Sequence, residues 1–581
     1  MTGGTVAEFR REIEARGLRA AAAGWLRRIR ESQIADPALW ISVVSEDALS
    51  ERIAGLEKAD ASRLPLYGVP FAVKDNIDAQ GFPTTAACPA FAYDPVGDAP
   101  AVRALLDAGA VCMGKTNMDQ FATGLVGTRS PYGTPVNPRD ARIIPGGSSS
   151  GSAVAVARGL VPFALGTDTA GSGRVPAALC GIHGWKPTRG LVSTRGVVPA
   201  CRSLDCVSVF ANSAADIAAL APVLAKYDSA DPWSRRSPPG TGSAPVSKLA
   251  IPHEHEMGFF GDDFQCRAWG ASIRKFEDAG FVIVRRSFAA FFEAARLLYE
   301  GPWVAERYHA IRDLLENRPE EILPVTRAII SAGARPSACD AFAAIYRLAE
   351  LRRASEEIWD VADAICLPTT GTIYTRAEVD ADPLRLNSNL GFYTNFFNLL
   401  DLCGLAMPME PREDGLPFGI TLAAPAGNDR RLMQTVAAFD GSAQVPPAAV
   451  DSRIELGVFG AHMRGFPLEP RLARLGASFV RTDRTAPVYR MAALDELRPG
   501  VFRAAGGGSL ELEVWSIPTA AVGELLCEIP PPLGLAKIFL RGGAEIVGFV
   551  CEAAAADGKP DITGAGGWRN YKARAASTAD S

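Results

Sequence analysis

Two clusters of serine and glycine between residues 146 and 190 give the sequence its strongest chemical signal. The first cluster holds Ser148, the second holds Ser172, and Lys74 lies upstream in AVKDN, where a short apolar strand is expected to end. A serine hydroxyl attacks a carbonyl carbon only when a neighbouring group takes its proton. A lysine can take that proton when burial or nearby positive charge keeps its amine neutral. Gly/Ser loops are common, so the combination with the lysine, rather than either cluster alone, favours hydrolytic chemistry.

The two clusters and the lysine, at these spacings, resemble the amidase signature family. The resemblance is strong over residues 65–190 and looser over the rest of the first 440 residues. It implies a Ser–Ser–Lys triad in which Ser172 is the nucleophile, Ser148 relays the proton and Lys74 is the base. It also implies a cis peptide bond between Gly147 and Ser148. Such a triad needs neither a metal ion nor an organic cofactor, and we expect none.

The stretch GTDTAGSGR around Ser172 has the small residues that an oxyanion-binding loop needs. Amide hydrolysis passes through a tetrahedral oxyanion that backbone N–H groups can stabilise, and small side chains let the backbone approach the substrate. The N–H groups expected to bind the oxyanion are those of Thr169, Ala170, Gly171 and Ser172. Ala170, Gly173 and Ser150 differ from residues common in the resembling family, but none of these differences removes a required functional group.

Three other motifs point to different chemistry. Residues 109–116, GAVCMGKT, match a P-loop pattern that would make Lys115 a nucleotide-binding residue, yet here a helical pattern precedes the glycine and a strand pattern follows it. GSSSG matches the nucleophile elbow of another hydrolase class, with Ser149 as nucleophile. That class needs a catalytic histidine, and none of the five histidines has a fitting context. The HEH motif at 253–255 lacks the third protein ligand of a catalytic zinc site.

The elements that must position these residues alternate between strand and helix. Apolar spacing predicts amphipathic helices in residues 5–60 and again from about 289 to 361. Around the Ser/Gly clusters, short apolar strands alternate with helices, while GIHGWKPTRG (181–190) is interpreted as a loop. The alternation indicates an α/β protein. The family resemblance implies, more specifically, a mixed sheet core surrounded by helices.

A change of composition divides the chain. The stretch GSAQVPPAAVDS is typical of a linker. We predict a first domain at residues 1–440 with a helical N-terminal region, a linker at 441–453, and a small, strand-rich α+β C-terminal domain at 454–575. A Pro-, Ser- and Gly-rich connection is expected at 228–247.

Composition and charge exclude several classes of protein. The 581 residues are 48% hydrophobic and 22% charged, as in soluble globular proteins. With 60 Lys plus Arg and 65 Asp plus Glu, the net charge of −5 argues against binding of nucleic acid or acidic lipid by bulk charge. The eleven cysteines include no CxxC pair, which indicates reduced thiols. No signal segment or membrane-spanning run is present, so we expect a cytoplasmic protein.

Phrases across nearly the whole chain, among them YEGPWVAERY, VFGAHMRGFPL and DITGAGGWRNY, resemble the allophanate hydrolases within this family. The resemblance implies cleavage of allophanate, the N-carboxylated form of urea, with release of ammonia. Residues 299–307 are expected to be helical, with an early turn at Pro302 as the alternative, so that Tyr299, Trp303 and Arg307 share one face. Arg307 would then clamp the substrate carboxylate through its planar guanidinium. Tyr299 would donate a hydrogen bond to the substrate, and Gly124 would bring backbone close to it. The alternative is a buried aromatic stripe with a surface arginine.

The same resemblance connects the C-terminal domain with a later step, the loss of carbon dioxide from an N-carboxycarbamate product. His462 is the only histidine of that domain and its acid/base candidate, and a purely structural histidine is an equal alternative. Four further residues are expected to line a pocket there: Tyr489, Glu513, Trp568 and Arg569. A role for the domain in dimer formation alone also stays open.

Other functions and partners stay open on sequence alone. The chain could be an amidase for another small amide, or an amidotransferase subunit that passes ammonia to a charged-tRNA partner, although it has no basic excess. The resemblance implies a homodimer and a small anionic amide substrate. That substrate would come from a biotin-dependent urea carboxylase or from a cyanuric-acid or biuret pathway.

Overall fold

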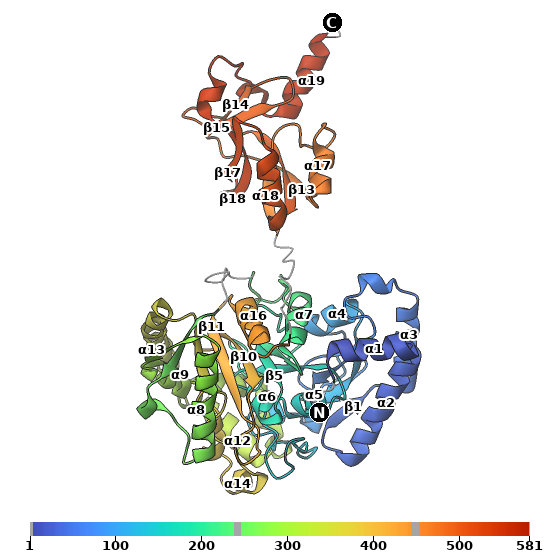
Figure 1. Cartoon of the computed structure of the whole chain (residues 1–581), viewed down its shortest axis with the longest axis vertical. Helices are drawn as coiled ribbons and strands as arrows, with labels where there is room; N and C mark the ends of the chain where they lie inside the picture. The colour runs from blue at the N-terminus through green and yellow to red at the C-terminus, as the bar shows by residue number, and fades with distance from the viewer. Residues whose placement is uncertain (1–3, 237–245, 443–452, 580–581) are drawn as a thin grey trace. The chain divides into compact units, whose positions relative to one another are not determined.

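The computed structural model describes residues 4–236, 246–442 and 453–579. The chain divides into two compact units, Met1–Pro446 and Pro447–Ser581 (Figure 1). The linker predicted at 441–453 lies almost entirely outside the described residues, as does part of the connection predicted at 228–247. In the described parts of the chain, no helix combines the length and apolar character that a membrane span requires.

The first unit is built on one mixed sheet of eleven strands, as the family resemblance implies. Its strands, in order across the sheet, are β1 (Trp40–Val43), β3 (Val111–Thr116), β2 (Pro70–Lys74), β4 (Phe163–Asp168), β6 (Cys206–Ala211), β5 (His183–Lys186), β10 (Leu402–Pro408), β11 (Gly419–Pro425), β9 (Ala364–Pro368), β7 (Lys248–Pro252) and β8 (Val282–Arg286). The interpretation of 181–190 as a loop is wrong for residues 183–186, because His183 and Trp185 pair with β6 inside the sheet. The sequence of β5, HGWK, has a single large apolar side chain and therefore shows neither an apolar run nor an apolar alternation.

Helices surround this sheet (Figure 1). They are α1 (Val6–Arg16), α2 (Leu18–Ala35), α3 (Glu46–Glu57), α4 (Pro100–Asp107), α5 (Ser150–Ala157), α6 (Val175–Cys180), α7 (Ala214–Leu224), α8 (Asp263–Asp278), α9 (Ala289–Glu300), α10 (Val304–Ala310), α11 (Arg312–Asn317), α12 (Pro324–Ser331), α13 (Ala338–Glu356), α14 (Arg376–Ala381), α15 (Arg385–Leu390) and α16 (Asp429–Phe439). Local sequence sets their ends: Thr5 and Glu8 form a capping box at the start of α1, and Gly17 ends it with a φ of 78°. The helices predicted for residues 5–60 are present, with β1 inserted between α2 and α3.

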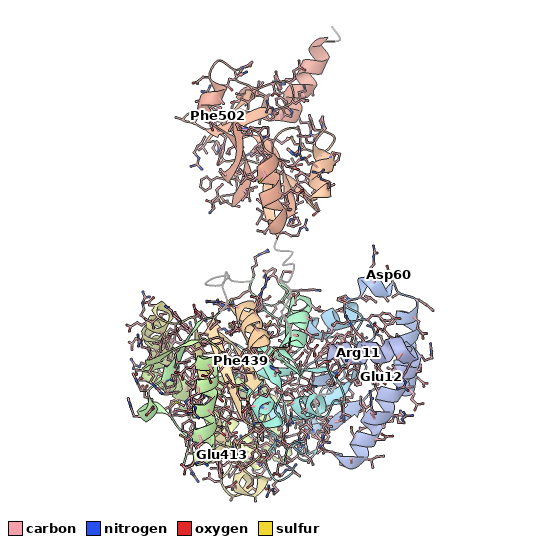
Figure 2. All side chains as sticks on the ribbon, viewed as in Figure 1. Arg11, Glu12, Asp60, Glu413, Phe439 and Phe502 are labelled. Carbon is pink, nitrogen blue, oxygen red and sulfur yellow. The ribbon has the colours of Figure 1, made fainter. Side chains whose placement is uncertain are left out.

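Side chains fill the space between the helices and the sheet (Figure 2). Phe439, at the end of α16, stacks on Phe276 of α8 with ring centroids 4.2 Å apart. Strands β2 and β4 are buried along their whole length and pair in parallel. The carboxyl ends of parallel strands meet at one edge of a sheet. This pairing therefore brings Lys74, the last residue of β2, beside the loop that follows β4.

The second unit is the strand-rich α+β domain that the sequence predicts. A five-stranded sheet has the order β13-β16-β12-β18-β17, and β14 pairs with β15 in a separate hairpin. The elements are β12 (Arg453–Val458), α17 (Glu469–Arg474), β13 (Ser478–Arg484), β14 (Tyr489–Ala493), β15 (Pro499–Arg503), β16 (Glu511–Pro518), α18 (Thr519–Glu528), β17 (Leu533–Phe539), β18 (Glu545–Cys551) and α19 (Trp568–Ala579). Tyr489 and Trp568 lie inside its hydrophobic core.

Candidate active site

Lys74 is fully buried at the end of β2 and contacts two hydroxyl groups. Its Nζ donates hydrogen bonds to Ser148 Oγ at 2.8 Å and to Thr167 Oγ1 at 2.6 Å. Burial lowers the pKa of Lys74 to about 7, because a charged ammonium is poorly solvated inside the protein. A large fraction of Lys74 is therefore neutral near pH 7. The amine meets the requirement for a base that the sequence pattern set.

Ser148 and Ser172 approach the site from the starts of two helices. The Gly147–Ser148 peptide bond is cis, as the resemblance implies. Ser148 lies two residues before the start of α5, within hydrogen-bonding distance of Lys74. Ser172 lies in the loop between β4 and α6 and is 3% exposed. Among the described residues, its hydroxyl has no hydrogen-bond partner. The structure thus joins Lys74 to Ser148 directly and leaves the Ser172 hydroxyl uncommitted.

The loop that carries Ser172 is held by a buried ion pair. Arg174 Nε lies 2.9 Å from Asp168 Oδ2, and both side chains are fully buried. The Asp168 carboxylate also accepts the N–H groups of Gly171 and Gly173, each at 3.0 Å. The expectation that the Gly171 N–H binds an oxyanion is therefore wrong, because Asp168 already occupies that donor. In the part of the chain that the structure describes, the N–H groups of Thr169, Ala170 and Ser172 have no acceptor, and they stay the oxyanion candidates.

Gly147 has no room for a side chain. A Cβ at this position would lie 2.0 Å from Asp119 Oδ2 and 2.6 Å from the Gly127 nitrogen. We expect Gly147→Ala to destabilise the first unit by about 1–3 kcal/mol through overpacking and to displace Ser148, so that hydrolysis falls at least about tenfold. Thermal unfolding and amidase assays check this. Gly55→Ala is the control, because nothing lies within 4 Å of its Cβ in α3. A Gly147→Ala protein as stable and active as the control would contradict the expectation.

Arg307 and Tyr299 lie on separate helices. The single helix predicted over 299–307 is wrong, because α9 ends at Glu300 and α10 begins at Val304. Pro302 lacks an N–H donor and disfavours helical backbone in the residue before it, which explains the break. The two side chains still meet: Arg307 Nη2 donates to Tyr299 Oη at 3.3 Å.

The Arg307 guanidinium is a buried cation whose hydrogen-bond partners among the described residues are all uncharged. It is 2% exposed, and its Nη1 donates to the Ala122 carbonyl at 3.2 Å and to Thr123 Oγ1 at 3.1 Å. Within the described ranges, no Asp or Glu oxygen lies within 4.0 Å of it. A buried charge without a counter-ion is unfavourable. The site is therefore suited to an anionic ligand, and the alternative of a surface arginine is wrong.

Gly124 directly follows Thr123, whose hydroxyl accepts a hydrogen bond from Arg307. A Cβ there would lie 2.7 Å from Asp119 Oδ2 and 3.1 Å from Arg129 Cδ. The glycine thus allows Asp119 and Arg129 to pack against its backbone. Contact between Gly124 and a substrate stays a prediction, as does the hydrogen bond from Tyr299.

The competing motifs have other roles. The residues that match the P-loop pattern form strand β3 instead of a phosphate-binding loop. Lys115 lies in this strand, with its Nζ 3.6 Å from Asp75 Oδ1, and both side chains are fully buried. Ser149 donates a hydrogen bond to the Thr167 carbonyl at 3.2 Å and thereby supports β4. His253 and His255 stack with centroids 5.6 Å apart. In the described chain, no three His, Cys, Asp or Glu side chains gather to hold a metal ion.

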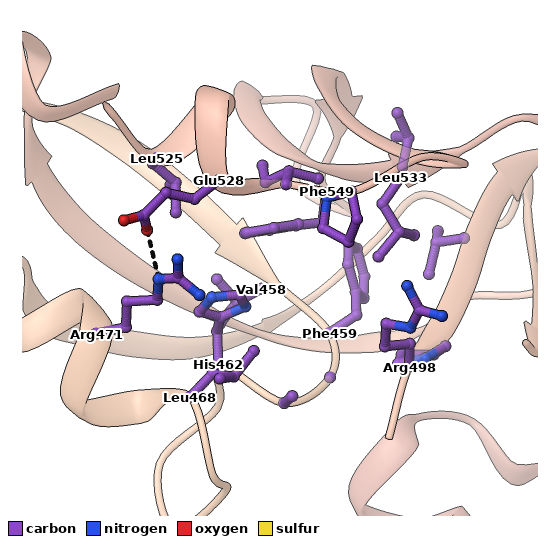
Figure 3. Close-up of a pocket in the computed structure, with 17 residues that line it drawn as sticks. Val458, Phe459, His462, Leu468, Arg471, Arg498, Leu525, Glu528, Leu533 and Phe549 are labelled. Atoms are coloured by element: carbon purple, nitrogen blue, oxygen red, sulfur yellow. Dashed lines mark hydrogen bonds and ion pairs between the residues drawn. The ribbon is translucent and has the colours of Figure 1, made fainter. Parts of the chain in front are cut away.

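The second unit contains a separate pocket of about 240 Å³. Figure 3 shows His462 in it, stacked on Phe549 with centroids 4.9 Å apart and near the ion pair of Arg471 with Glu528. The other walls are largely apolar. Burial lowers the pKa of His462 to about 4, with Arg471 adding to the effect and Glu528 opposing it. The imidazole is therefore neutral at physiological pH.

Comparison with known proteins identifies both units. A family model described as Amidase matches residues 26–433, about 70% of the chain. The chain belongs to the amidase family. A second model, described as Allophanate hydrolase C-terminal domain, matches residues 454–573. The amidase family model therefore spans the two serine clusters and Lys74, and the second model spans the pocket of His462.

Individual relatives of this amidase agree with both matches. A solved structure of Kluyveromyces lactis allophanate hydrolase, carrying the S177A substitution, is 38% identical, with 98% of each chain covered and a TM-score of 0.74. Urea amidolyase of Lachancea kluyveri is 41% identical over 94% of this chain and 32% of its own length. The chain spans about a third of the length of such curated relatives. One subunit of the glutamyl-tRNA(Gln) amidotransferase of Methanosarcina acetivorans is 41% identical over 48% of this chain and 58% of its own length.

The pocket that contains His462 is not lined by the four further residues that the sequence analysis expected in the second unit of this amidase. Tyr489 and Trp568 are core residues, and the Tyr489 hydroxyl accepts the Phe539 N–H at 2.9 Å. Glu513 is buried and pairs with Arg569 at 3.0 Å. Polar residue types in a short strand-rich domain do not distinguish a pocket wall from a buried ion pair, and this is why the sequence misplaced them.

The neutral state of His462 in this amidase is directly testable. We expect its NMR signal to stay constant as the pH falls from 8 to 5.5 and to titrate near pH 4. Because the unfolded state binds this proton near pH 6.5 and the folded state does not, the contribution to stability is lost as the pH falls from about 6.5 towards 4. His462→Asn assigns the signal. A midpoint near 6.5 would contradict the expectation.

Proposed function

We propose that the chain hydrolyses allophanate to ammonia and N-carboxycarbamate. The observation that carries the proposal is the contact between a buried Lys74 of near-neutral pKa and Ser148, beside the loop of Ser172. This arrangement supplies an activated nucleophile, which an amide substrate requires because its carbonyl is a weak electrophile. The similarity to the solved structure of Kluyveromyces lactis allophanate hydrolase supports the choice of substrate.

In the acylation step, neutral Lys74 takes the proton of Ser148 while Ser148 takes the proton of Ser172. The Ser172 Oγ forms a bond to the amide carbon, and the carbonyl oxygen becomes an oxyanion. The N–H groups of Thr169 and Ala170, with that of Ser172, stabilise this charge. The C–N bond then breaks, the proton returns through Ser148, and ammonia leaves the acyl-enzyme.

In the deacylation step, water attacks the acyl carbon. Its proton passes through Ser148 to Lys74, and the bond to Ser172 Oγ breaks. Ser172 regains a proton, and N-carboxycarbamate leaves with the hydroxyl group of the water. None of the bonds made or broken requires an oxidant, a reductant or a group beyond these side chains and water.

Arg307 selects the substrate by its charge. The allophanate carboxylate would pair with the guanidinium, while Tyr299 would donate a hydrogen bond to the same end of the molecule. Urea has no carboxylate and would leave the buried cation unpaired, so it is rejected. Gly124 would place its backbone against the ligand.

We further propose that the pocket of His462 takes the N-carboxycarbamate and assists its loss of carbon dioxide. The pocket supports this through its largely apolar walls, its neutral imidazole and two arginines at its edge, Arg471 and Arg498. Apolar surroundings destabilise a carboxylate relative to the neutral carbon dioxide that leaves. A purely structural role for the unit is the alternative.

The supply of substrate follows from its chemistry. Relatives named urea amidolyase favour a biotin-dependent urea carboxylase as the source, and a cyanuric-acid or biuret pathway stays the alternative. The homodimer and the cytoplasmic location stay predictions. An amidotransferase subunit is the competing function, but it leaves the second unit without a role.

Ammonia release from fresh allophanate, urea and biuret by the purified chain tests the substrate. We expect rapid release from allophanate and slow release from the two neutral compounds. Equal release from biuret and allophanate would replace the proposal with a broader amidase. Release only after addition of a tRNA-binding partner protein would favour the amidotransferase.

A further inference from the structure

Asp205 is a buried carboxylate that the mechanism above does not use. We propose that Asp205 is a positioning residue that holds the oxyanion-binding loop through Thr169 and supplies a negative charge to the site of Lys74. The inference rests on the proposed function and adds a residue to the machinery of that same site. It is carried by two sets of contacts and by the charges around them.

The first contacts join Asp205 to the oxyanion-binding loop. Asp205 is 5% exposed and lies directly before β6. Its Oδ1 accepts the hydroxyl of Thr169 and the N–H of Cys201, the latter at 3.1 Å, while Oδ2 accepts the N–H of Ala200 at 2.8 Å. Both carboxylate oxygens are thus fixed by donors. The Thr169 side chain is fixed in turn, and with it the backbone N–H that we assign to the oxyanion.

The second contacts join the same short segment to the helix of Arg307. The Cys201 thiol donates to the Trp303 carbonyl at 3.4 Å, and the Ser203 N–H donates to the Glu306 carboxylate at 2.9 Å. Glu306 precedes Arg307 in α10. Residues 200–205 therefore connect the loop that binds the oxyanion with the helix that carries the carboxylate clamp.

No ion pair within the described residues explains the burial of Asp205. In the described part of the chain, no Lys or Arg nitrogen lies within 4.0 Å of its carboxylate. Burial raises its pKa to about 6, and the hydrogen bonds from Thr169, Cys201 and Ala200 oppose that rise, as does Arg307. The carboxylate is therefore mostly ionised above pH 7. A structural salt bridge would not produce this arrangement.

The charge of Asp205 acts on Lys74. Burial is the main cause of the lowered Lys74 pKa, Arg307 adds to it, and the carboxylates of Asp119, Asp205 and Asp168 oppose it. Removing one of these negative charges disfavours the ammonium further. The Lys74 pKa should then fall, and the neutral base should persist to lower pH.

The pH dependence of kcat/KM in Asp205→Asn tests the electrostatic part. We expect kcat to fall about tenfold or more, since one N–H donor of the oxyanion site loses its support. The acid limb of the kcat/KM profile, where activity falls with decreasing pH, should move to lower pH by about half a unit. Asp216→Asn is the matched control, because Asp216 is also buried with a pKa raised to about 6. Its carboxylate accepts the N–H of Val6 at the start of α1, and its own N–H donates to Ser213 Oγ at the start of α7. The acid limb of Asp216→Asn should match wild type. An unmoved limb in Asp205→Asn would overturn the inference.

Two substitutions of Thr169 test the positioning part. Thr169→Val keeps the shape of the side chain but removes its hydroxyl, so kcat should fall while KM changes little. Thr169→Ser keeps the hydroxyl and should recover most of that loss. Equal kcat values in the valine and serine variants would overturn the contact between Thr169 and Asp205 as a determinant of rate.

A substrate-independent readout separates this inference from the proposed function. A fluorophosphonate forms a bond between Ser172 Oγ and phosphorus, releases fluoride, and passes the serine proton towards Lys74. Its rate of labelling should show the same shifted acid limb in Asp205→Asn. Labelling of wild type without ammonia release from allophanate would reject the substrate alone. Labelling with the same pH profile in wild type and Asp205→Asn would reject the role of Asp205.

Discussion

Replacing Arg307 by alanine will remove the preference of the enzyme for an anionic substrate. The buried guanidinium has no carboxylate partner in the described protein, so its partner is expected to be the substrate. Loss of one member of a buried charge pair corresponds to a fall in kcat/KM for allophanate of about 10²–10³-fold. Steady-state ammonia release measures this.

Biuret is the matched comparison for Arg307→Ala, because it carries a carboxamide where allophanate carries a carboxylate. The kcat/KM for biuret should change less than about tenfold, because this neutral compound cannot form an ion pair with Arg307. Arg307→Lys keeps the positive charge but loses the planar guanidinium. Its kcat/KM for allophanate should lie between those of the wild type and Arg307→Ala. An equal loss on both substrates would show that Arg307 supports the fold of the site rather than recognising charge.

Replacing Lys74 by methionine will abolish hydrolysis while stabilising the first unit. Loss of a member of a catalytic triad that acts as a unit lowers kcat by about 10⁴-fold or more. In the wild type, kcat/KM should rise with pH through about 7, because only the neutral amine accepts a proton. Ammonia release between pH 5.5 and 9 measures both effects.

Stability separates the catalytic role of Lys74 from a structural one. The folded pKa of Lys74, about 7, lies below the ordinary value, so between pH 7 and 10 the unfolded state binds the proton more tightly. The lysine therefore opposes folding at pH 7, and its contribution improves as the pH rises. Lys74→Met should unfold at a higher temperature than wild type at pH 7. A less stable, partly active variant would contradict the assignment.

The parts of the site that local sequence determines could be predicted. Ser148 and Ser172 lie within Ser/Gly clusters and Lys74 ends an apolar strand, and the family resemblance of these motifs at their spacings assigned the triad roles. The fold followed from alternating strands and helices together with the family resemblance. The contact between Lys74 and Ser148 agrees with those predictions.

The parts that depend on tertiary packing could not be predicted. Whether Arg307 lies at the surface or inside depends on how α10 packs, and a break at Pro302 did not prevent its contact with Tyr299. The Gly171 N–H was assigned to the oxyanion because sequence does not show that Asp168 turns back to accept it. Asp205 and Thr167 have ordinary local sequences, and only the meeting of distant strands brings them to Lys74 and its neighbours.

Ammonia release from fresh allophanate by wild type, Ser172→Ala and Ser149→Ala tests the central claim most directly. Ser149 belongs to the competing nucleophile motif, but its hydroxyl is bonded to the Thr167 carbonyl. We predict that Ser172→Ala releases ammonia no faster than the uncatalysed reaction. Ser149→Ala should keep at least about a tenth of the wild-type rate, because it loses only the two hydrogen bonds between Ser149 Oγ and the backbone of Thr167. Loss of activity in Ser149→Ala with retention in Ser172→Ala would contradict the Ser–Ser–Lys mechanism.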